Sequence, residues 1–102
     1  MKTITSEDEF NVSSGLFAVK FTADWCGPCK KQQPNIDKME AEFPIVQFLE
    51  VDADKFPSLV QKYGVKSLPT LVLIKDNVVV TKIVGVTLIS GLRTSFIGFI
   101  KE

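Results

Sequence analysis

Apolar and polar residues follow two different spacings along the chain. Runs of β-branched, aromatic and other apolar residues, such as GLFAVKFTA and LPTLVLI, are typical of buried strands. Between these runs, apolar residues recur every three or four positions, as they do on one face of a helix. The two spacings predict strands at about 2–4, 16–22, 45–51, 70–75 and 78–84, and helices at about 7–12, 28–43, 57–64 and within 87–102.

The order of these elements, β-α-β-α-β-α-β-β-α, predicts a mixed α/β fold. Strands separated by helices form parallel pairs, whereas the last two strands, joined by Asp76-Asn77, form an antiparallel hairpin. We therefore expect a single domain over residues 1–102, with a central mixed β-sheet of five strands flanked by four helices.

Local signals support the predicted helices. Ser6 and Glu9 match the S-x-x-E capping box at the start of the first one. Pro28 suits the first turn of the second helix, and Asp54 is placed to cap the third. Pro34 lies inside the second helix, where it removes a backbone hydrogen bond and should bend the helix.

Charge and composition exclude several classes of function. Twelve Lys and Arg balance twelve Asp and Glu, so no broad positive field is available to bind nucleic acid or an anionic membrane. The segment MKTITSEDEF is polar and acidic where a signal peptide would be basic and then apolar, and no apolar run has the length of a membrane span. We therefore expect a cytoplasmic protein. The lack of histidine excludes Ser/His and Cys/His catalysis and all histidine metal ligands.

The only two cysteines, Cys26 and Cys29, lie together in FTADWCGPCKK. If the strand ends near Thr22 and the next helix begins near Cys26, then Cys26 sits at a helix N-terminus and Cys29 lies one turn further inside. Free N–H groups and the positive end of the helix dipole stabilise a thiolate there, so we expect Cys26 to be the attacking sulfur. Cys29 then resolves the mixed disulfide, which makes the reaction dithiol–disulfide exchange.

Two other interpretations of the cysteine pair are weaker. C-x-x-C also forms half of a zinc or cluster site, but the chain has no further Cys or His to complete one, so we expect no metal. A purely structural disulfide would close too short a loop to stabilise the fold much. Gly27 permits close approach of a substrate backbone, and Pro28 stiffens the turn and influences how readily the dithiol gives up electrons.

The segment Trp25-Cys26-Gly27-Pro28-Cys29-Lys30 resembles the active-site motif of the thioredoxin family. The resemblance covers essentially the whole chain and continues through Pro34, Asp52-Ala53-Asp54, Tyr63-Gly64-Val65, Leu68-Pro69-Thr70 and Val84-Gly85. It implies the thioredoxin fold and a small, monomeric protein-disulfide reductase that carries electrons. It also implies that no cofactor is bound, because the redox-active disulfide Cys26-Cys29 performs the chemistry.

The same resemblance implies a substrate surface beside the cysteines. In this family a cis peptide bond, here Leu68-Pro69, packs against them. With Trp25, Gly27-Pro28 and the Val84-Gly85 loop, it forms a shallow apolar surface that holds a substrate strand next to the attacking sulfur. The implied partners are proteins that contain disulfides and a thioredoxin reductase that draws on NADPH or ferredoxin. Lys30 is expected to be a solvated helix charge that adds slightly to thiolate stabilisation.

One pair of residues departs from the family pattern. Thioredoxins usually carry a buried aspartate that assists proton transfer at the second cysteine, and a lysine on the neighbouring strand pairs with it. The matching positions here hold Lys20 and Glu50, so the charges are exchanged. Strand alternation predicts that the two residues form an ion pair if their strands are adjacent. Either Glu50 takes the carboxylate's role near Cys29, directly or through water, while Lys20 holds it ionised, or the pair is only structural.

Two alternative functions stay open for a chain of this family. An oxidase or isomerase of the same fold usually carries histidine between its cysteines, so Gly27-Pro28 favours a reductant. A thioredoxin-fold binding subunit would instead use the exposed apolar surface, and its cysteines would be dispensable. Serine variants of Cys26 and Cys29 distinguish this binding subunit from an enzyme.

Overall fold

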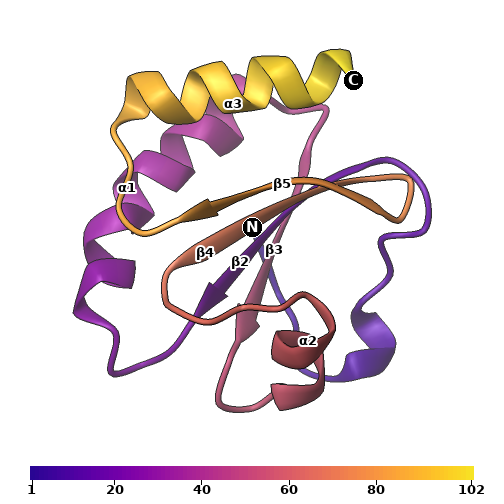
Figure 1. Cartoon of the computed structure of the whole chain (residues 1–102), viewed down its shortest axis with the longest axis vertical. Helices are drawn as coiled ribbons and strands as arrows, with labels where there is room; N and C mark the ends of the chain where they lie inside the picture. Colours follow the sequence, from indigo (N-terminus) through magenta and orange to yellow (C-terminus); the bar gives the residue numbers. More distant parts are fainter.

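The computed structural model describes all 102 residues and contains one five-stranded sheet (Figure 1). The strands are β1 (Lys2–Thr3), β2 (Leu16–Thr22), β3 (Gln47–Asp52), β4 (Thr70–Lys75) and β5 (Val78–Val84). Their order across the sheet is β1-β3-β2-β4-β5. The pairs β1–β3 and β3–β2 are parallel, whereas β2–β4 and β4–β5 are antiparallel. The predicted mixed sheet of five strands is confirmed.

Three α-helices pack on this sheet: α1 (Gly27–Glu42), α2 (Pro57–Lys62) and α3 (Ile89–Lys101). The prediction of four helices is wrong, because the segment expected at 7–12 forms only one short 3-10 turn, η1 (Glu7–Glu9). The Glu9 carboxylate does accept the backbone N–H of Ser6 at 3.1 Å. The backbone then becomes extended at Phe10, because Phe10 and the buried Val12 pack into the core, which a further helical turn would prevent.

Helices cover both faces of the sheet, and each face has its own apolar core. Figure 1 shows α1 and α3 on one side and α2 with η1 on the other. The core under α1 and α3 is centred on Phe96, whose ring stacks on Phe43 and Phe48 at centroid distances of 5.4 and 5.6 Å. The opposite core contains Tyr63, which packs on Phe21, and burial raises the pKa of the Tyr63 hydroxyl. Alternate residues of β2 and β3 point into these two cores.

Helix α1 runs from Gly27 to Glu42 with Pro34 in its interior, as the sequence predicts. One capping detail differs from the prediction. Asp54 does not cap α2, because the N-cap position is held by Phe56. The Asp54 carboxylate is therefore free for another role near the cysteines. None of the helices is long and apolar enough to cross a membrane.

The hairpin between β4 and β5 is confirmed at Asp76-Asn77. These residues have φ values of +47° and +69°, the backbone conformation that a tight two-residue turn requires. Asp76 also accepts the backbone N–H of Gly15 at 2.7 Å, which fixes the turn against the segment that enters β2. The end of β5 therefore lies at the same edge of the sheet as the disulfide end of β2, with the start of β4 between them.

Candidate active site

The two cysteines lie at the connection from β2 to α1 and form a disulfide. Cys26 is the N-cap residue of α1, and its Sγ accepts the backbone N–H of Cys29 at 3.2 Å. Their Cα atoms are 5.3 Å apart, within the normal range for a disulfide. The predicted placement of Cys26 at a helix N-terminus is confirmed. The Cys29 N–H and the positive end of the helix dipole can therefore stabilise the Cys26 sulfur as a thiolate.

Both sulfurs are shielded from solvent in the oxidised protein. Cys26 and Cys29 are 2% and 1% exposed, and they form a small buried cluster with Ala23, against which Leu68 packs. Solvent exposure therefore does not distinguish the attacking sulfur from the resolving one. Their positions on the helix do, because only Cys26 occupies the N-cap.

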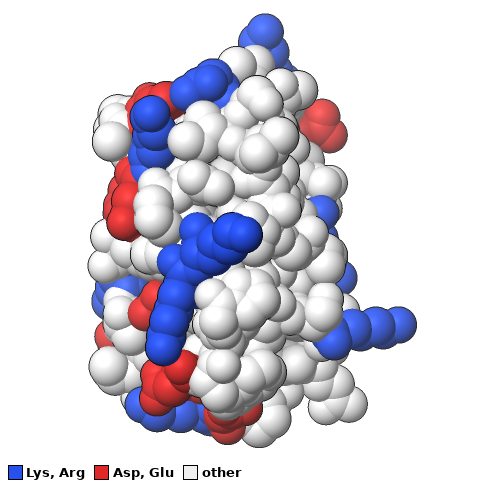
Figure 2. Space-filling view, turned by 90° about the vertical axis from the view of Figure 1, so that its left-hand side faces the viewer, with Lys and Arg blue, Asp and Glu red and all other residues white.

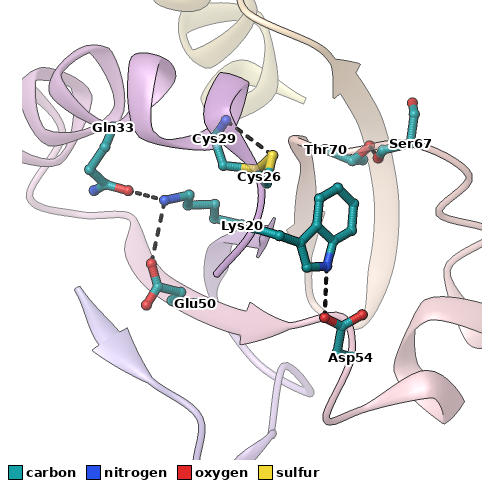
Figure 3. Close-up of a disulfide and its surroundings, with 9 residues drawn as sticks. Lys20, Cys26, Cys29, Gln33, Glu50, Asp54, Ser67 and Thr70 are labelled. Atoms are coloured by element: carbon teal, nitrogen blue, oxygen red, sulfur yellow. Dashed lines mark hydrogen bonds and ion pairs between the residues drawn. A yellow bond between two sulfur atoms is a disulfide. The ribbon is translucent and has the colours of Figure 1, made fainter. Parts of the chain in front are cut away.

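The loop before β4 packs against the disulfide, and its Leu68–Pro69 peptide bond is cis. Thr70 Oγ1 donates a hydrogen bond to the Ser67 carbonyl at 2.7 Å, which closes this loop (Figure 3). The backbone N–H of Gly85 donates to the Pro69 carbonyl at 2.8 Å. The two loops expected to hold a substrate are thus bonded to each other.

A hollow of about 290 Å³ lies beside Trp25, and we call it the apolar hollow. Its apolar lining comes from Trp25, Ala53, Pro57, Val60, Val65 and Leu68, with Asp54 and Lys66 as its charged residues. Trp25 is 71% exposed, which agrees with a surface role, and its indole N–H donates to Asp54 Oδ2 at 2.8 Å. Asp54 therefore orients the indole instead of capping α2.

A second hollow, of about 510 Å³, lies next to Cys29, and we call it the polar hollow. Lys20 Nζ lies 3.4 Å from Glu50 Oε2 and also donates to Gln33 Oε1 (Figure 3). Lys20 and Glu50 are direct partners in the β2–β3 register, so the predicted ion pair is confirmed. The Lys20 side chain is only 5% exposed, whereas that of Glu50 is 28% exposed. The charged residues that line the polar hollow are Lys20, Asp24, Lys30 and Glu50.

Known proteins resemble this chain in both sequence and fold. The family model for thioredoxin matches residues 2–97. The chain belongs to the thioredoxin family. A thioredoxin from Chlamydia muridarum is 44% identical over 87 residues, which are 83% of this chain and 85% of that protein. The crystal structure of thioredoxin from Trypanosoma brucei brucei has a TM-score of 0.88 and 33% identity, and the match covers 98% of this chain and 90% of that one.

Thioredoxins are protein-disulfide oxidoreductases, and the Cys26–Cys29 pair gives this chain the same dithiol–disulfide chemistry. A further match comes from a structure of the thiol resolving mechanism in yeast mitochondrial 1-Cys peroxiredoxin via glutathione/thioredoxin systems. Its matching chain has a TM-score of 0.83 and 31% identity, with 93% of this chain and 92% of that one covered. The fold and the cysteine pair thus agree with those of the family.

Two polar side chains that the sequence does not single out hold the loops around the disulfide in place. Gln32 is buried, and its Oε1 accepts the backbone N–H of Thr87 at 3.1 Å. Asn35 donates to the Thr87 carbonyl at 3.1 Å. Together they fasten the β5–α3 connection to α1. One signal was present, because Gln32 occupies a position of the apolar stripe that Ile36 and Met39 continue.

Exposed apolar residues lie on one side of the active site. Val84 at the end of β5, and Val86 and Leu88 in the β5–α3 connection, are 61%, 45% and 79% exposed. This connection and the start of α1 are on the left of Figure 1, and Figure 2 views that side. Residues without charge cover most of this face, Lys and Arg side chains cross its middle, and most acidic groups lie toward its left edge and its base. The exposed Val84, Val86 and Leu88 side chains offer apolar contact to a partner on this side of the site.

Proposed function

We propose that this chain is a protein-disulfide reductase in which Cys26 attacks and Cys29 resolves. The observation that carries the assignment is the N-cap position of Cys26, whose sulfur accepts the Cys29 N–H at 3.2 Å. In the reduced protein the same N–H and the helix dipole stabilise the Cys26 thiolate, and the thiolate is the nucleophile in disulfide exchange. Cys29 follows in the first helical turn, which keeps it within reach.

The reaction then has two exchange steps. The Cys26 thiolate attacks one sulfur of a substrate disulfide, and the other substrate sulfur leaves as a thiolate. The Cys29 thiolate next attacks Cys26 Sγ, forms the Cys26–Cys29 bond and releases the second substrate sulfur. Two electrons pass from the protein to the substrate, and the protein ends as the disulfide described above.

The surface around the sulfurs supports binding of an extended substrate segment. The backbone N–H and C=O of Leu68 make no hydrogen bond within the chain. They are therefore free to pair with a substrate strand, as in other cases of strand addition. Trp25, Gly27-Pro28 and the Val84-Gly85 loop supply contacts around it, and backbone pairing of this kind accepts many substrate sequences.

The partners of such a reductase are proteins with accessible disulfides and a thioredoxin reductase, linked to NADPH or ferredoxin, that regenerates the dithiol. A peroxiredoxin is one substrate class, since a match of this chain comes from a peroxiredoxin thiol-resolving system. We further propose that the chain is one domain, acts as a monomer, needs no bound cofactor beyond its own cysteines, and works in the reducing cytoplasm.

Reduction of insulin disulfides, with dithiothreitol as the electron source, tests this proposal. We expect Cys26→Ser to abolish the acceleration, because the nucleophile is lost. Cys29→Ser is expected to accumulate a mixed disulfide between Cys26 and the substrate, which mass spectrometry detects. If both serine variants were as active as the parent, the binding-subunit alternative would replace the reductase.

The reduction potential separates the reductase from an oxidase or isomerase. We expect equilibration with a reference dithiol couple to give a potential below that of the cytosolic glutathione pool. A markedly more oxidising potential would instead favour the oxidase or isomerase.

A further inference from the structure

Lys20 is the only charged residue that the fold buries. It belongs to β2, the strand that leads into the cysteine motif, and its side chain is 5% exposed. Its ammonium group lies between the Glu50 carboxylate and the Gln33 side-chain carbonyl (Figure 3). The ammonium takes no part in the attack by Cys26 or in the resolution by Cys29 as described above. A buried charge is costly to keep, so its position next to the redox pair needs an explanation.

The surroundings of Cys29 contain one charge that is shielded from water. Asp24, from the β2–α1 connection, and Lys30, from α1, also line the polar hollow, but both are exposed. Glu50, from β3, is partly exposed and faces Lys20. Water screens the exposed charges, whereas the field of a buried ammonium is screened much less. Of the charges that line the polar hollow beside Cys29, that of Lys20 is therefore the least screened by water.

We propose that the Lys20 ammonium stabilises the thiolate of Cys29 through its charge, and that Glu50 and Gln33 are positioning residues that hold the ammonium beside the polar hollow. An ammonium ion cannot accept a proton, so this role differs from that of a carboxylate base. The sequence left two interpretations of Glu50: a carboxylate that acts near Cys29, or one half of a purely structural pair. The proposed role is a third, in which the Glu50 carboxylate holds Lys20 in place and the Lys20 charge acts on the Cys29 sulfur. The inference rests on the proposed function for its catalytic meaning.

The charge acts in the second exchange step. In the mixed disulfide between Cys26 and a substrate, the Cys29 S–H gives its proton to water in the polar hollow, which Cys29 lines. The Cys29 thiolate attacks Cys26 Sγ, the Cys26–Cys29 bond forms, and the bond from Cys26 to the substrate sulfur breaks. That sulfur leaves with the electron pair and takes a proton from solvent. Lys20 neither gives nor takes a proton in this step, which balances without it.

The lone Cys29 thiol of a Cys26→Ser protein provides a direct test that needs no disulfide reductase activity. The ultraviolet absorbance of the thiolate is followed against pH in this background, with and without Lys20→Met. Since an opposite charge nearby favours the charged form of a group, we expect Lys20→Met to raise the titration midpoint by about one pH unit. Lys20→Arg keeps the charge and is expected to restore most of the shift.

Lys30→Met is the matched control, because Lys30 lines the same hollow but is exposed. We expect a much smaller shift for this variant. Equal midpoint shifts for Lys20→Met and Lys30→Met would show a general charge effect and would overturn the proposal, as would an unchanged midpoint in Lys20→Met.

The double variant Lys20→Met/Glu50→Leu keeps the inference testable if Lys20→Met alone does not fold, because it leaves neither member of the Lys20–Glu50 pair without its partner. In the Cys26→Ser background its midpoint is expected to lie above that of the parent, since Lys20 is more buried than Glu50. A midpoint at or below that of the parent would contradict the proposal.

The two proposals also fail in different ways. A parent chain that does not reduce insulin would refute the reductase and leave the titration result standing. An active parent whose Cys29 midpoint ignores Lys20 would refute only the role of the lysine.

Discussion

The apolar hollow and the polar hollow lie beside the same redox site but depend on different forces. The apolar hollow is lined by aliphatic side chains around one exposed indole, and a single hydrogen bond that the indole donates to Asp54 orients it. The polar hollow depends on an ammonium group that Glu50 and Gln33 keep satisfied away from water. Apolar contact is tolerant of shape and sequence, whereas a buried charge depends on each of its partners. Substrate binding and sulfur chemistry are therefore expected to respond to different substitutions.

The largest effect is expected from Glu50→Leu, measured as the free energy of unfolding in urea. Removing this carboxylate leaves the Lys20 ammonium buried without its counterion, which costs about 3 kcal/mol when one partner of a buried pair is lost. Lys20→Met should cost clearly less, because the carboxylate that it leaves unpaired is 28% exposed and can be hydrated.

The double variant Lys20→Met/Glu50→Leu sharpens this test. It is expected to recover most of the stability, because two apolar side chains replace the pair without leaving a charge. If the double variant were no more stable than Glu50→Leu alone, the cost would come from packing, and the distinction between the two hollows would lose its electrostatic basis.

The next largest effect is expected from Trp25→Ala in the apolar hollow. The indole presents apolar surface to a bound substrate, so its loss should raise KM about tenfold, equivalent to about 1.4 kcal/mol of binding. The kcat value should change little, because Trp25 does not line the polar hollow beside Cys29. Stability should stay within about 0.5 kcal/mol of the parent, since the indole is 71% exposed. A fall in kcat at unchanged KM would place Trp25 in the sulfur chemistry instead.

The contrast between the hollows also shows what the sequence can predict. Residues 70–75 and 78–84 were predicted to the residue, because β-branched runs and a two-residue turn are local signals. Cys26 at the helix N-terminus followed from Pro28 and from the end of the preceding apolar run. The Lys20–Glu50 pair followed from strand alternation together with a resemblance that marked both positions.

Long-range polar contacts were not predictable in this way. Asp54 looked like a helix cap, and only the folded chain brings its carboxylate to the Trp25 indole. Gln33 appears as one more polar residue on the exposed side of an amphipathic helix, and nothing local indicates that it accepts a hydrogen bond from Lys20. The overestimate of the first helix has a similar cause, since burial of Val12 prevailed over a correct capping signal.

A smaller effect is expected from Asp54→Ala, which removes the acceptor of the indole N–H. Losing one exposed hydrogen bond should weaken substrate binding about threefold, less than losing the indole itself. Trp25 is the only tryptophan, so its fluorescence reports directly on its new environment. Asp24→Ala is the matched control, since Asp24 is also exposed but lines the polar hollow. An identical emission change in both variants would mean that general charge, and not the Asp54 contact, determines the signal.

The smallest effect is expected from an ion pair far from both hollows, between Glu42 at the end of α1 and Arg93 on α3. Arg93 Nη2 lies 2.6 Å from Glu42 Oε1, and hydrogen bonding by Arg93 lowers the pKa of Glu42 below its usual value. A group with a lowered folded-state pKa contributes stability above its unfolded pKa and loses it as pH falls through the folded pKa. Glu42→Gln should therefore be slightly less stable than the parent at neutral pH and should match it in strong acid.

Urea midpoints of Glu42→Gln and the parent, compared across pH, measure this difference, and added salt should reduce it because the pair is exposed. The rate of insulin reduction should be the same for both proteins at neutral pH, since neither Glu42 nor Arg93 reaches the disulfide. A slower rate would show that a small loss of α1 stability is transmitted to Cys26 and Cys29. The larger effects of Lys20 and Trp25 variants could then no longer be assigned to local contacts in the two hollows.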